Sequence, residues 1–183
     1  MIAKEELNIL WSLEQTAEKY EDRVAVSDVN QELTWKELVK KAQVIGAELS
    51  EKVQPGNPVP VLLEKSSETL AVMLGIVYAG CFYVPVNPIN PTERLRKIME
   101  KLEPEVIISD EKGKEQLAAV GIGLEEKVIG PETLLPTTGT DLSEEQRSKL
   151  EQIQGQWKET DALYGIFTSG STGTPKAIVV SHG

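Results

Sequence analysis

The residues with the clearest capacity for chemistry form one short segment near the end of the 183-residue chain. Glycines let a backbone approach a ligand closely, and successive backbone N–H groups in a turn can bind an anion. Hydroxyl groups add donors, and a lysine adds a point charge suited to phosphate. All of these residue types occur together in the segment Thr168, Ser169, Gly170, Ser171, Thr172, Gly173, Thr174, Pro175 and Lys176. The segment therefore predicts a phosphate-binding loop.

This loop differs from the Walker A motif. In Walker A the lysine directly follows a glycine, whereas Thr174 and Pro175 separate Gly173 from Lys176 here. Lys176 is also the only Asp, Glu, Lys or Arg residue from position 162 to the end. A plainer interpretation stays open, in which the segment is a hairpin loop whose hydroxyl groups merely solvate the turn.

Helical and strand-like patterns alternate along the rest of the chain. Apolar spacing predicts a helix over 5–20, and Thr34 with Glu37 forms a capping box that opens a second helix. A third helix is predicted to begin at Ser66 or Ser67, and a fourth at Pro91, with Asn90 as its N-cap. Two more are predicted to begin before position 116 and at position 141. The stretch 130–140 is predicted to be a loop. Short apolar runs predict strands at 24–26, 59–63, 81–86, 105–109, 127–129, 162–167 and 177–180.

The predicted strands are continuous apolar runs rather than alternating ones. Such runs are typical of strands that helices cover on both faces. The alternation with helices therefore predicts an α/β fold with a mostly parallel sheet flanked by helices. Ligands of such sheets gather at the carboxyl ends of the strands, which is where the phosphate-binding loop follows a predicted strand.

Composition excludes several classes of function. Nineteen Lys and Arg against twenty-nine Asp and Glu give a net charge of −10, which disfavours binding to nucleic acid or to an anionic membrane. The single cysteine, Cys81, excludes an internal disulfide framework and a multi-cysteine zinc site. No apolar run has the length of a membrane span or the character of a signal core, so a cytoplasmic location is expected.

The segment from Thr168 to Lys176 resembles the phosphate-binding signature of the adenylate-forming (AMP-binding) superfamily. That superfamily includes acyl-CoA synthetases, luciferases and the amino-acid adenylation domains of nonribosomal peptide synthetases. The segments Leu33–Leu38 and Tyr78–Asn87 are similar to two further elements of the superfamily, and Pro88–Leu95 continues the second. The second element is most like that of peptide synthetase adenylation domains and D-alanine–carrier protein ligases. Asn87 stands where Asp is usual, and Ala177 stands where Gly is usual.

The resemblance implies a reaction in two halves. ATP, with Mg²⁺, and an amino acid or other carboxylate would give an acyl-adenylate and pyrophosphate, and the phosphopantetheine of a carrier protein would then accept the acyl group as a thioester. The loop would hold the β- and γ-phosphates of ATP. The family's magnesium carboxylate, substrate pocket and catalytic lysine correspond to positions beyond Gly183, so no catalytic or metal-binding residue is assigned within the chain.

Residues 1–183 are accordingly expected to form one N-terminal subdomain fragment of an adenylation domain, inactive by itself. The rest of the large domain and the C-terminal subdomain would lie outside it. Two alternatives remain open. One is a fragment of an acyl-CoA or aryl-acid ligase, and the other is a non-catalytic α/β interaction module that retains the loop.

Plain structural interpretations suit the remaining candidates. His182 lacks a catalytic constellation and is expected to pack near the nucleotide, and Cys81 is expected to act as a small buried hydrophobe. The Glu125–Glu126 and Glu144–Glu145 pairs are expected to be solvated surface rather than metal ligands. Because a phosphate-binding loop without nucleotide has few partners, weak order is expected over 169–175.

Overall fold

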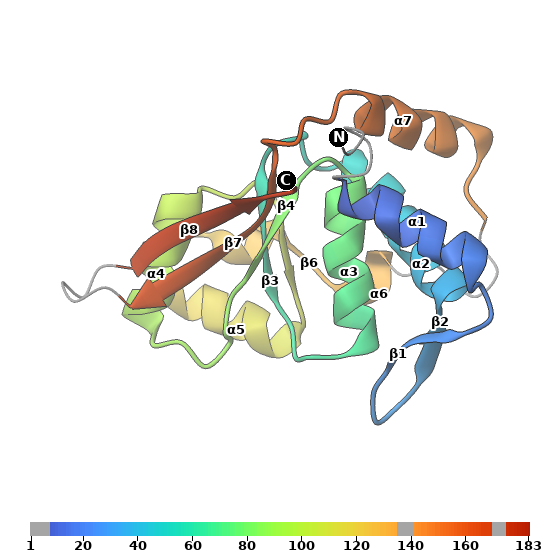
Figure 1. Ribbon diagram of the computed structural model, residues 1–183. Coiled ribbons are helices and arrows are strands. Elements are labelled where there is room, and N and C mark those ends of the chain that lie inside the picture. The colour runs from blue at the N-terminus through green and yellow to red at the C-terminus, as the bar shows by residue number, and fades with distance from the viewer. Residues whose placement is uncertain (1–7, 135–140, 170–174) are drawn as a thin grey trace.

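A six-stranded sheet forms the centre of the computed structural model, which describes residues 8–134, 141–169 and 175–183 (Figure 1). Four of its five neighbouring strand pairs are parallel, and the β7–β8 hairpin is antiparallel. The strands in spatial order are β6 (Val128–Ile129), β5 (Ile107–Ser109), β3 (Pro58–Leu62), β4 (Phe82–Pro85), β7 (Ala162–Ser169) and β8 (Pro175–Ser181). The prediction of a mostly parallel sheet is confirmed.

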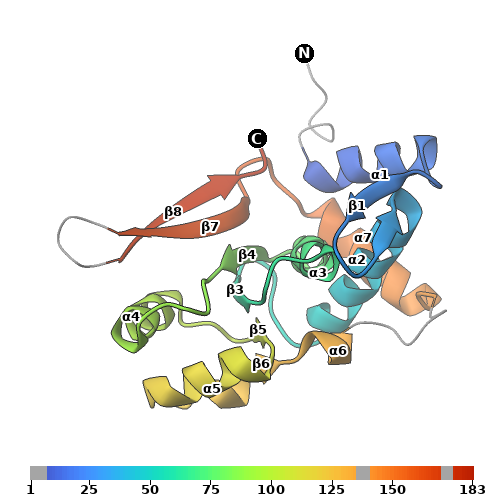
Figure 2. The same cartoon turned by 90° about the horizontal axis from the view of Figure 1, so that it is seen from below.

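Helices cover both faces of this sheet (Figure 2). The helices on one side are α1 (Ile9–Lys19), α2 (Trp35–Ser50), α3 (Ser67–Tyr78) and α7 (Glu144–Gly155), and those on the other are α4 (Thr92–Leu102) and α5 (Glu111–Val120). Alternate residues of β3 face the two layers: Val61 belongs to the apolar cluster that contains α2 and α3, and Leu62 to the cluster that contains α4 and α5. Both faces of the sheet are therefore buried, as continuous apolar strands require.

The helix starts follow local capping chemistry where the sequence signal is strong. The Thr34 side chain accepts from the Glu37 N–H at 3.3 Å, and the Glu37 carboxylate accepts from the Thr34 N–H at 2.8 Å, which confirms the capping box. The Ser66 side chain caps α3 by accepting from the Thr69 N–H at 3.0 Å. Gly80, one residue beyond the C-cap of α3, has a φ of 76° that suits glycine.

Three predicted helix starts are wrong by a few residues. Helix α1 begins at Ile9 rather than at position 5, and the Asn8 side chain caps it. Pro91, not Asn90, is the N-cap of α4, because the extended ψ of 144° at Pro91 keeps it outside the helix. No side chain caps this helix, and its first helical hydrogen bond runs from the Leu95 N–H to the Pro91 carbonyl. Helix α7 begins at Glu144 rather than 141, because Ser143 forms a capping box with Gln146.

Three short elements were not predicted or were predicted as loop. Strand β2 (Glu32–Thr34) pairs with β1 (Val24–Ser27) in a separate antiparallel hairpin. A 3₁₀ turn covers Leu124–Lys127. The predicted loop over 130–140 contains helix α6 (Pro131–Leu134), which forms because Leu134 is buried in the core at 1% exposure; residues 135–140 lie outside the described part of the chain.

The turn of the β1–β2 hairpin is tied to the start of α3 by Asp28. Its carboxylate accepts hydrogen bonds from the Ser67 N–H and the Ser67 hydroxyl, both at 2.7 Å, and from the N–H groups of Asn30 and Gln31. These bonds, the Ser67 backbone bond above all, hold the pKa of Asp28 well below its usual range. The charge also lies where the N-terminal end of the α3 dipole favours an anion.

Replacing Asp28 with asparagine is expected to lower stability at neutral pH and to change its pH dependence. A carboxyl group whose folded pKa is depressed stabilises the fold above its unfolded pKa of about 4, and this contribution is lost as the pH falls toward the folded value. Urea unfolding midpoints measured from pH 7 to pH 2 should therefore fall less steeply for Asp28→Asn than for the wild type. Asp22→Asn, in the exposed turn before β1, is the control and should follow the wild-type curve.

Candidate functional site

The two ends of the segment predicted to bind phosphate, Thr168–Ser169 and Pro175–Lys176, lie at the carboxyl edge of the sheet. Strand β7 pairs in parallel with β4 through Tyr83 and Tyr164, whose rings stack with centroids 5.7 Å apart. The carboxyl end of β7 therefore points to the same edge as the ends of β3, β4 and β5. This is the edge at which α/β sheets bind ligands.

The β7–β8 hairpin brings the two ends of the segment together. Thr168 lies opposite Lys176, and Ser169 lies opposite Pro175. Directly opposed residues of antiparallel strands share one face, so the exposed Thr168 and Lys176 side chains project from the same side of the hairpin. The residues between them, Gly170, Ser171, Thr172, Gly173 and Thr174, lie outside the described part of the chain, as does most of the stretch predicted to have weak order.

The two departures from the family pattern fit the structure without strain. The Asn87 side-chain oxygen accepts a hydrogen bond from the Ile89 N–H at 2.9 Å, which is a bond that an aspartate in its place would also accept. Ala177 is exposed on β8 opposite Phe167, so its methyl group has space beside the strand. Neither residue blocks the approach to Thr168 and Lys176.

One cation near the hairpin lies in the Pro88–Leu95 stretch that resembles the family, but the sequence did not indicate its contact. Arg94, in the first turn of α4, donates from Nη2 to the Phe167 carbonyl at 3.4 Å. Helix α4 also contacts β8, and Figure 1 shows it beside the loop end of the hairpin. No local pattern could reveal this contact, because it joins residues 73 positions apart.

Cys81 and His182 lie at the opposite edge of the sheet from the loop. Both line a hollow of about 410 Å³ near the starts of β4 and β7. His182 packs edge-on against Trp157 at 5.3 Å, and its burial lowers the pKa of the imidazole. The packing role predicted for His182 fits this contact. Strand β8 carries it to the end of the hairpin away from Lys176, and its packing near the nucleotide stays a prediction.

The Cys81 thiol is buried, as predicted, with 2% of the residue exposed. Burial raises the pKa of this thiol to about 12, and the S–H group donates to the Gln54 carbonyl at 3.3 Å. Thiolate is the reactive form of cysteine, and very little forms near neutral pH at such a pKa. Cys81 is therefore a packing residue rather than a nucleophile.

Alkylation of Cys81 is expected to report unfolding. With iodoacetamide at pH 8, the folded chain should react at least about tenfold more slowly than the chain in denaturing urea, because the thiol is both protonated and covered. Mass spectrometry of the modified protein measures both rates, and the single cysteine makes the signal unambiguous. Equal rates in the two conditions would contradict the buried position.

The two acidic pairs lie in the 3₁₀ turn Leu124–Lys127 and at the start of α7. Glu126, Glu144 and Glu145 are exposed, as expected, but Glu125 is half-buried, so the prediction of a solvated side chain is wrong there. Its buried Oε2 atom has no hydrogen-bond partner among the described residues. Within 8–134, 141–169 and 175–183, no group of three or more His, Cys, Asp or Glu residues could hold a metal ion.

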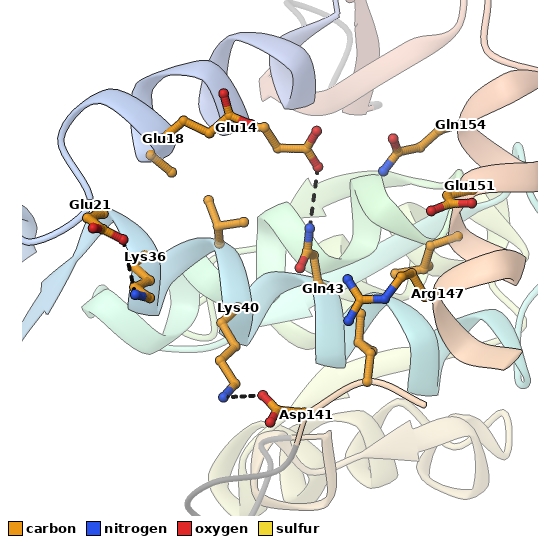
Figure 3. Close-up of a pocket in the computed structure, with 14 residues that line it drawn as sticks. Glu14, Glu18, Glu21, Lys36, Lys40, Gln43, Asp141, Arg147, Glu151 and Gln154 are labelled. Carbon is orange, nitrogen blue, oxygen red and sulfur yellow. Dashed lines mark hydrogen bonds and ion pairs between the residues drawn. The ribbon is translucent and has the colours of Figure 1, made fainter. Parts of the chain in front are cut away.

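A separate groove of about 540 Å³ lies between α1, α2 and α7, on the opposite side of the molecule from the β7–β8 hairpin (Figures 1 and 3). Its walls carry charges of both signs that pair with one another. Lys40 forms an ion pair with Asp141, and the Gln43 amide donates to the Glu14 carboxylate at 3.4 Å. The first pair joins α2 to the segment before α7, and the second joins α2 to α1.

Comparison with known proteins identifies the family. Residues 13–183 match the family described as AMP-binding enzyme. The chain belongs to this family. Bacitracin synthase 1 of Bacillus licheniformis is 34% identical over 174 residues, which are 92% of this chain and 3% of the synthase. Tyrocidine synthase 1 of Brevibacillus parabrevis is 32% identical over 170 residues, which are 92% of this chain and 15% of that synthase. The AMP-binding chain thus spans a small part of the length of these synthases.

Solved structures share the fold of this AMP-binding chain. The N-terminal subdomain of Klebsiella oxytoca NpsA, in complex with 3-hydroxybenzoyl-AMSN, matches with a TM-score of 0.76 at 22% identity over 96% of this chain and 41% of that one. VinN, in complex with L-aspartate, matches with a TM-score of 0.75 at 24% identity over 99% of this chain and 48% of that one. The fold is that of an N-terminal subdomain of adenylate-forming enzymes. None of its described helices has the length and apolar character to cross a membrane.

Proposed function

We propose that residues 1–183 are the N-terminal subdomain of an amino-acid-activating adenylation domain, and that their part in the reaction is to hold the phosphates of ATP. The observation that carries this proposal is the position of the signature segment. It joins two paired strands at the ligand-binding edge of the sheet, with Thr168 and Lys176 on one face. The similarity to bacterial peptide synthases supports the amino-acid branch of the family.

The residues at the base of the loop suit a polyphosphate. The Thr168 hydroxyl can donate to a phosphate oxygen, and Lys176 places an ammonium group on the same face. No carboxylate side chain occurs from position 162 to the end of the sequence, so no acidic side chain within this stretch repels an anion. We assign Ser169, Gly170, Ser171, Thr172, Gly173, Thr174 and Pro175 to the same site. The hydroxyls, and the backbone N–H groups of all these residues except Pro175, would surround the phosphates.

ATP supplies the activated phosphate and the pyrophosphate leaving group, and this chain orients them and offsets their charge. Charge stabilisation and positioning of this kind account for much of the catalysis of phosphate chemistry. Mg²⁺ would accompany the nucleotide, held mainly by phosphate oxygens and one or two carboxylates. The magnesium carboxylate of the family corresponds to a position beyond Gly183, so we assign the protein ligand of this ion there.

Transfer of the acyl group to a carrier-protein thiol belongs to the same proposal. In a complete adenylation domain the adenylate formed at this loop would be attacked by the phosphopantetheine thiol. We assign that half-reaction and the choice of amino acid to residues outside this chain. The 183-residue fragment is therefore expected to bind phosphate groups without forming an adenylate.

Activation of an aryl acid is the second candidate. It is favoured by the structural match to NpsA, whose complex contains a 3-hydroxybenzoyl compound, whereas the VinN complex contains L-aspartate. The TM-scores of 0.76 and 0.75 are nearly equal, so the fold does not distinguish these substrates. The sequence similarity to peptide synthases leads us to prefer the amino acid.

ATP–pyrophosphate exchange tests the proposal. The 183-residue chain should show only background exchange with amino acids or aryl acids, whereas a chain extended along its reading frame should show exchange that depends on one amino acid. Exchange by the short chain would overturn the assignment of the remaining machinery to later residues. Dependence on an aryl acid would select the second candidate, and a stop codon after Gly183 would favour a non-catalytic module.

A further inference from the structure

Arg94 links α4 to the carboxyl end of β7, one residue before the phosphate-binding segment. The residue is half-buried, and its Nη2 atom donates to the Phe167 carbonyl at 3.4 Å. Thr168, the first residue of the segment, follows immediately. Of the contacts of β7 and β8 with helices, the one with α4 is the most extensive in the described part of the chain.

The Phe167 carbonyl lies where β7 extends beyond the end of its neighbour β4. Tyr83 is paired with Tyr164, and extending this parallel register by two residues places Pro85, the last residue of β4, beside Ile166. Phe167 is one position further on, where β4 offers no backbone N–H, and Pro85 itself has none. Phe167 is paired with Ala177 of β8 on the other side of β7, and a partly buried carbonyl without a donor is costly. The Arg94 guanidinium is such a donor.

We propose that Arg94 is a positioning residue for the phosphate-binding segment. By holding the Phe167 carbonyl, it fixes the direction in which β7 ends and so the place of the Thr168 hydroxyl relative to Lys176. Its positive charge also lies near the base of a loop that is expected to receive a polyphosphate. The effect of Arg94 on phosphate binding rests on the proposed function, whereas its effect on the end of β7 concerns the ligand-free chain.

The same helix contains a matched control. Arg96 donates from the same atom, Nη2, to a backbone carbonyl, that of Val120, at 3.0 Å. That bond joins α4 to the end of α5 rather than to β7. A substitution at Arg96 therefore removes the same side chain, charge and type of bond from the same helix without touching the hairpin.

The first experiment records backbone amide NMR spectra of the ligand-free 183-residue chain. Arg94→Gln should move the amide signals of Thr168, Ser169 and Lys176, and Arg96→Gln should move those near Val120 instead. Thermal unfolding of both variants shows whether the fold is retained. If Arg94→Gln leaves the signals of Thr168 and Lys176 unchanged, the proposal is wrong, whatever the ligand experiments show.

The second experiment titrates the same variants with magnesium-ATP and magnesium-pyrophosphate, with adenosine as the phosphate-free control. Arg94→Gln should weaken binding of both phosphate ligands about three- to tenfold, as loss of one hydrogen bond at the loop base predicts, and Arg94→Lys should restore part of it. Arg96→Gln should bind them as the wild type does. Equal weakening by both glutamine variants would show a general effect of α4 and overturn the role of Arg94. Absence of binding by the wild type would contradict the proposed function, while the amide signals would still decide the position of Arg94.

Discussion

Replacing Gly75 with alanine is expected to destabilise the fold by about 1–3 kcal/mol, a large fraction of the roughly 5–15 kcal/mol that holds a domain together. Helices α2 and α3 cross in close contact at this glycine. A Cβ atom at Gly75 would lie 2.4 Å from Ile45 Cγ2 and 2.6 Å from Ile45 Cβ. Since the Ile45 Cβ is attached directly to the α2 backbone, no rotamer change relieves this clash, and the helices must separate.

The crossing is reciprocal, which explains the size of the expected effect. A Cβ atom at Gly46, on α2, would lie 2.5 Å from Tyr78 Cβ on α3. Tyr78 is fully buried, and its hydroxyl donates to the Glu14 carboxylate of α1 at 2.8 Å. Separation of α2 from α3 would therefore also disturb the bond to α1. Because α3 connects β3 to β4, the same movement would reach the centre of the sheet.

Gly155→Ala is the matched control for Gly75→Ala. Gly155 is the last residue of α7, and a Cβ atom there would meet nothing within 4 Å. Alanine at an unstrained helical position stabilises by about 0.4–1 kcal/mol or has little effect. Urea unfolding followed by circular dichroism should show a lowered midpoint for Gly75→Ala only. Equal midpoints for the two variants would contradict the close crossing of α2 and α3.

The sequence predicted the layers of this fold better than their contacts. The capping box at Thr34 and the cap at Ser66 are local chemistry, visible within a few residues, and the apolar runs of β3 and β4 are long enough to show a buried strand. Nothing in the sequence indicated that Gly46 meets the helix of Gly75, because that contact depends on how two separate helices cross.

Short elements escaped prediction for a different reason. Strand β2 has three residues, of which only Leu33 is buried, so it contains no repeat of a pattern. Helix α6 lies in a stretch rich in threonine and proline, and burial of Leu134 decides its structure. Local propensity therefore indicated a loop where tertiary contacts form a helix turn.

In the candidate site, too, the sequence predicted the motif but not the tertiary contact beside it. The residue types of the segment from Thr168 to Lys176 predicted phosphate chemistry, and the apolar runs on either side predicted the strands that flank it. The contact of Arg94 with the Phe167 carbonyl depends on the length by which β7 exceeds β4, and that difference appears only when the strands are paired. The edge position of His182, likewise, follows from the antiparallel return of β8.

Removal of the Lys176 side chain is expected to have the largest effect on ligand binding. Lys176→Ala should weaken binding of magnesium-ATP roughly 10- to 100-fold, because a hydrogen bond to a charged group contributes about 1.5–3 kcal/mol. Stability should stay close to that of the wild type, since Lys176 is exposed on an edge strand. Isothermal titration with magnesium-ATP measures the first effect, and urea unfolding measures the second. The same variant in a longer, active chain should lower kcat/KM for ATP.

Lys158→Ala controls for the loss of one positive charge. Lys158 is exposed in the turn before β7, at the end of that strand away from the loop, so its removal changes the net charge equally without altering the loop base. Lys176→Arg separates charge from shape, because the guanidinium keeps the charge in a larger planar group. If the lysine acts mainly as a point charge, arginine should recover most of the affinity at low salt, and the difference between wild type and Lys176→Ala should shrink as salt rises. Equal affinity of Lys176→Ala and Lys158→Ala would remove Lys176 from the phosphate site and leave the hydroxyl and backbone groups of the loop as its only candidates.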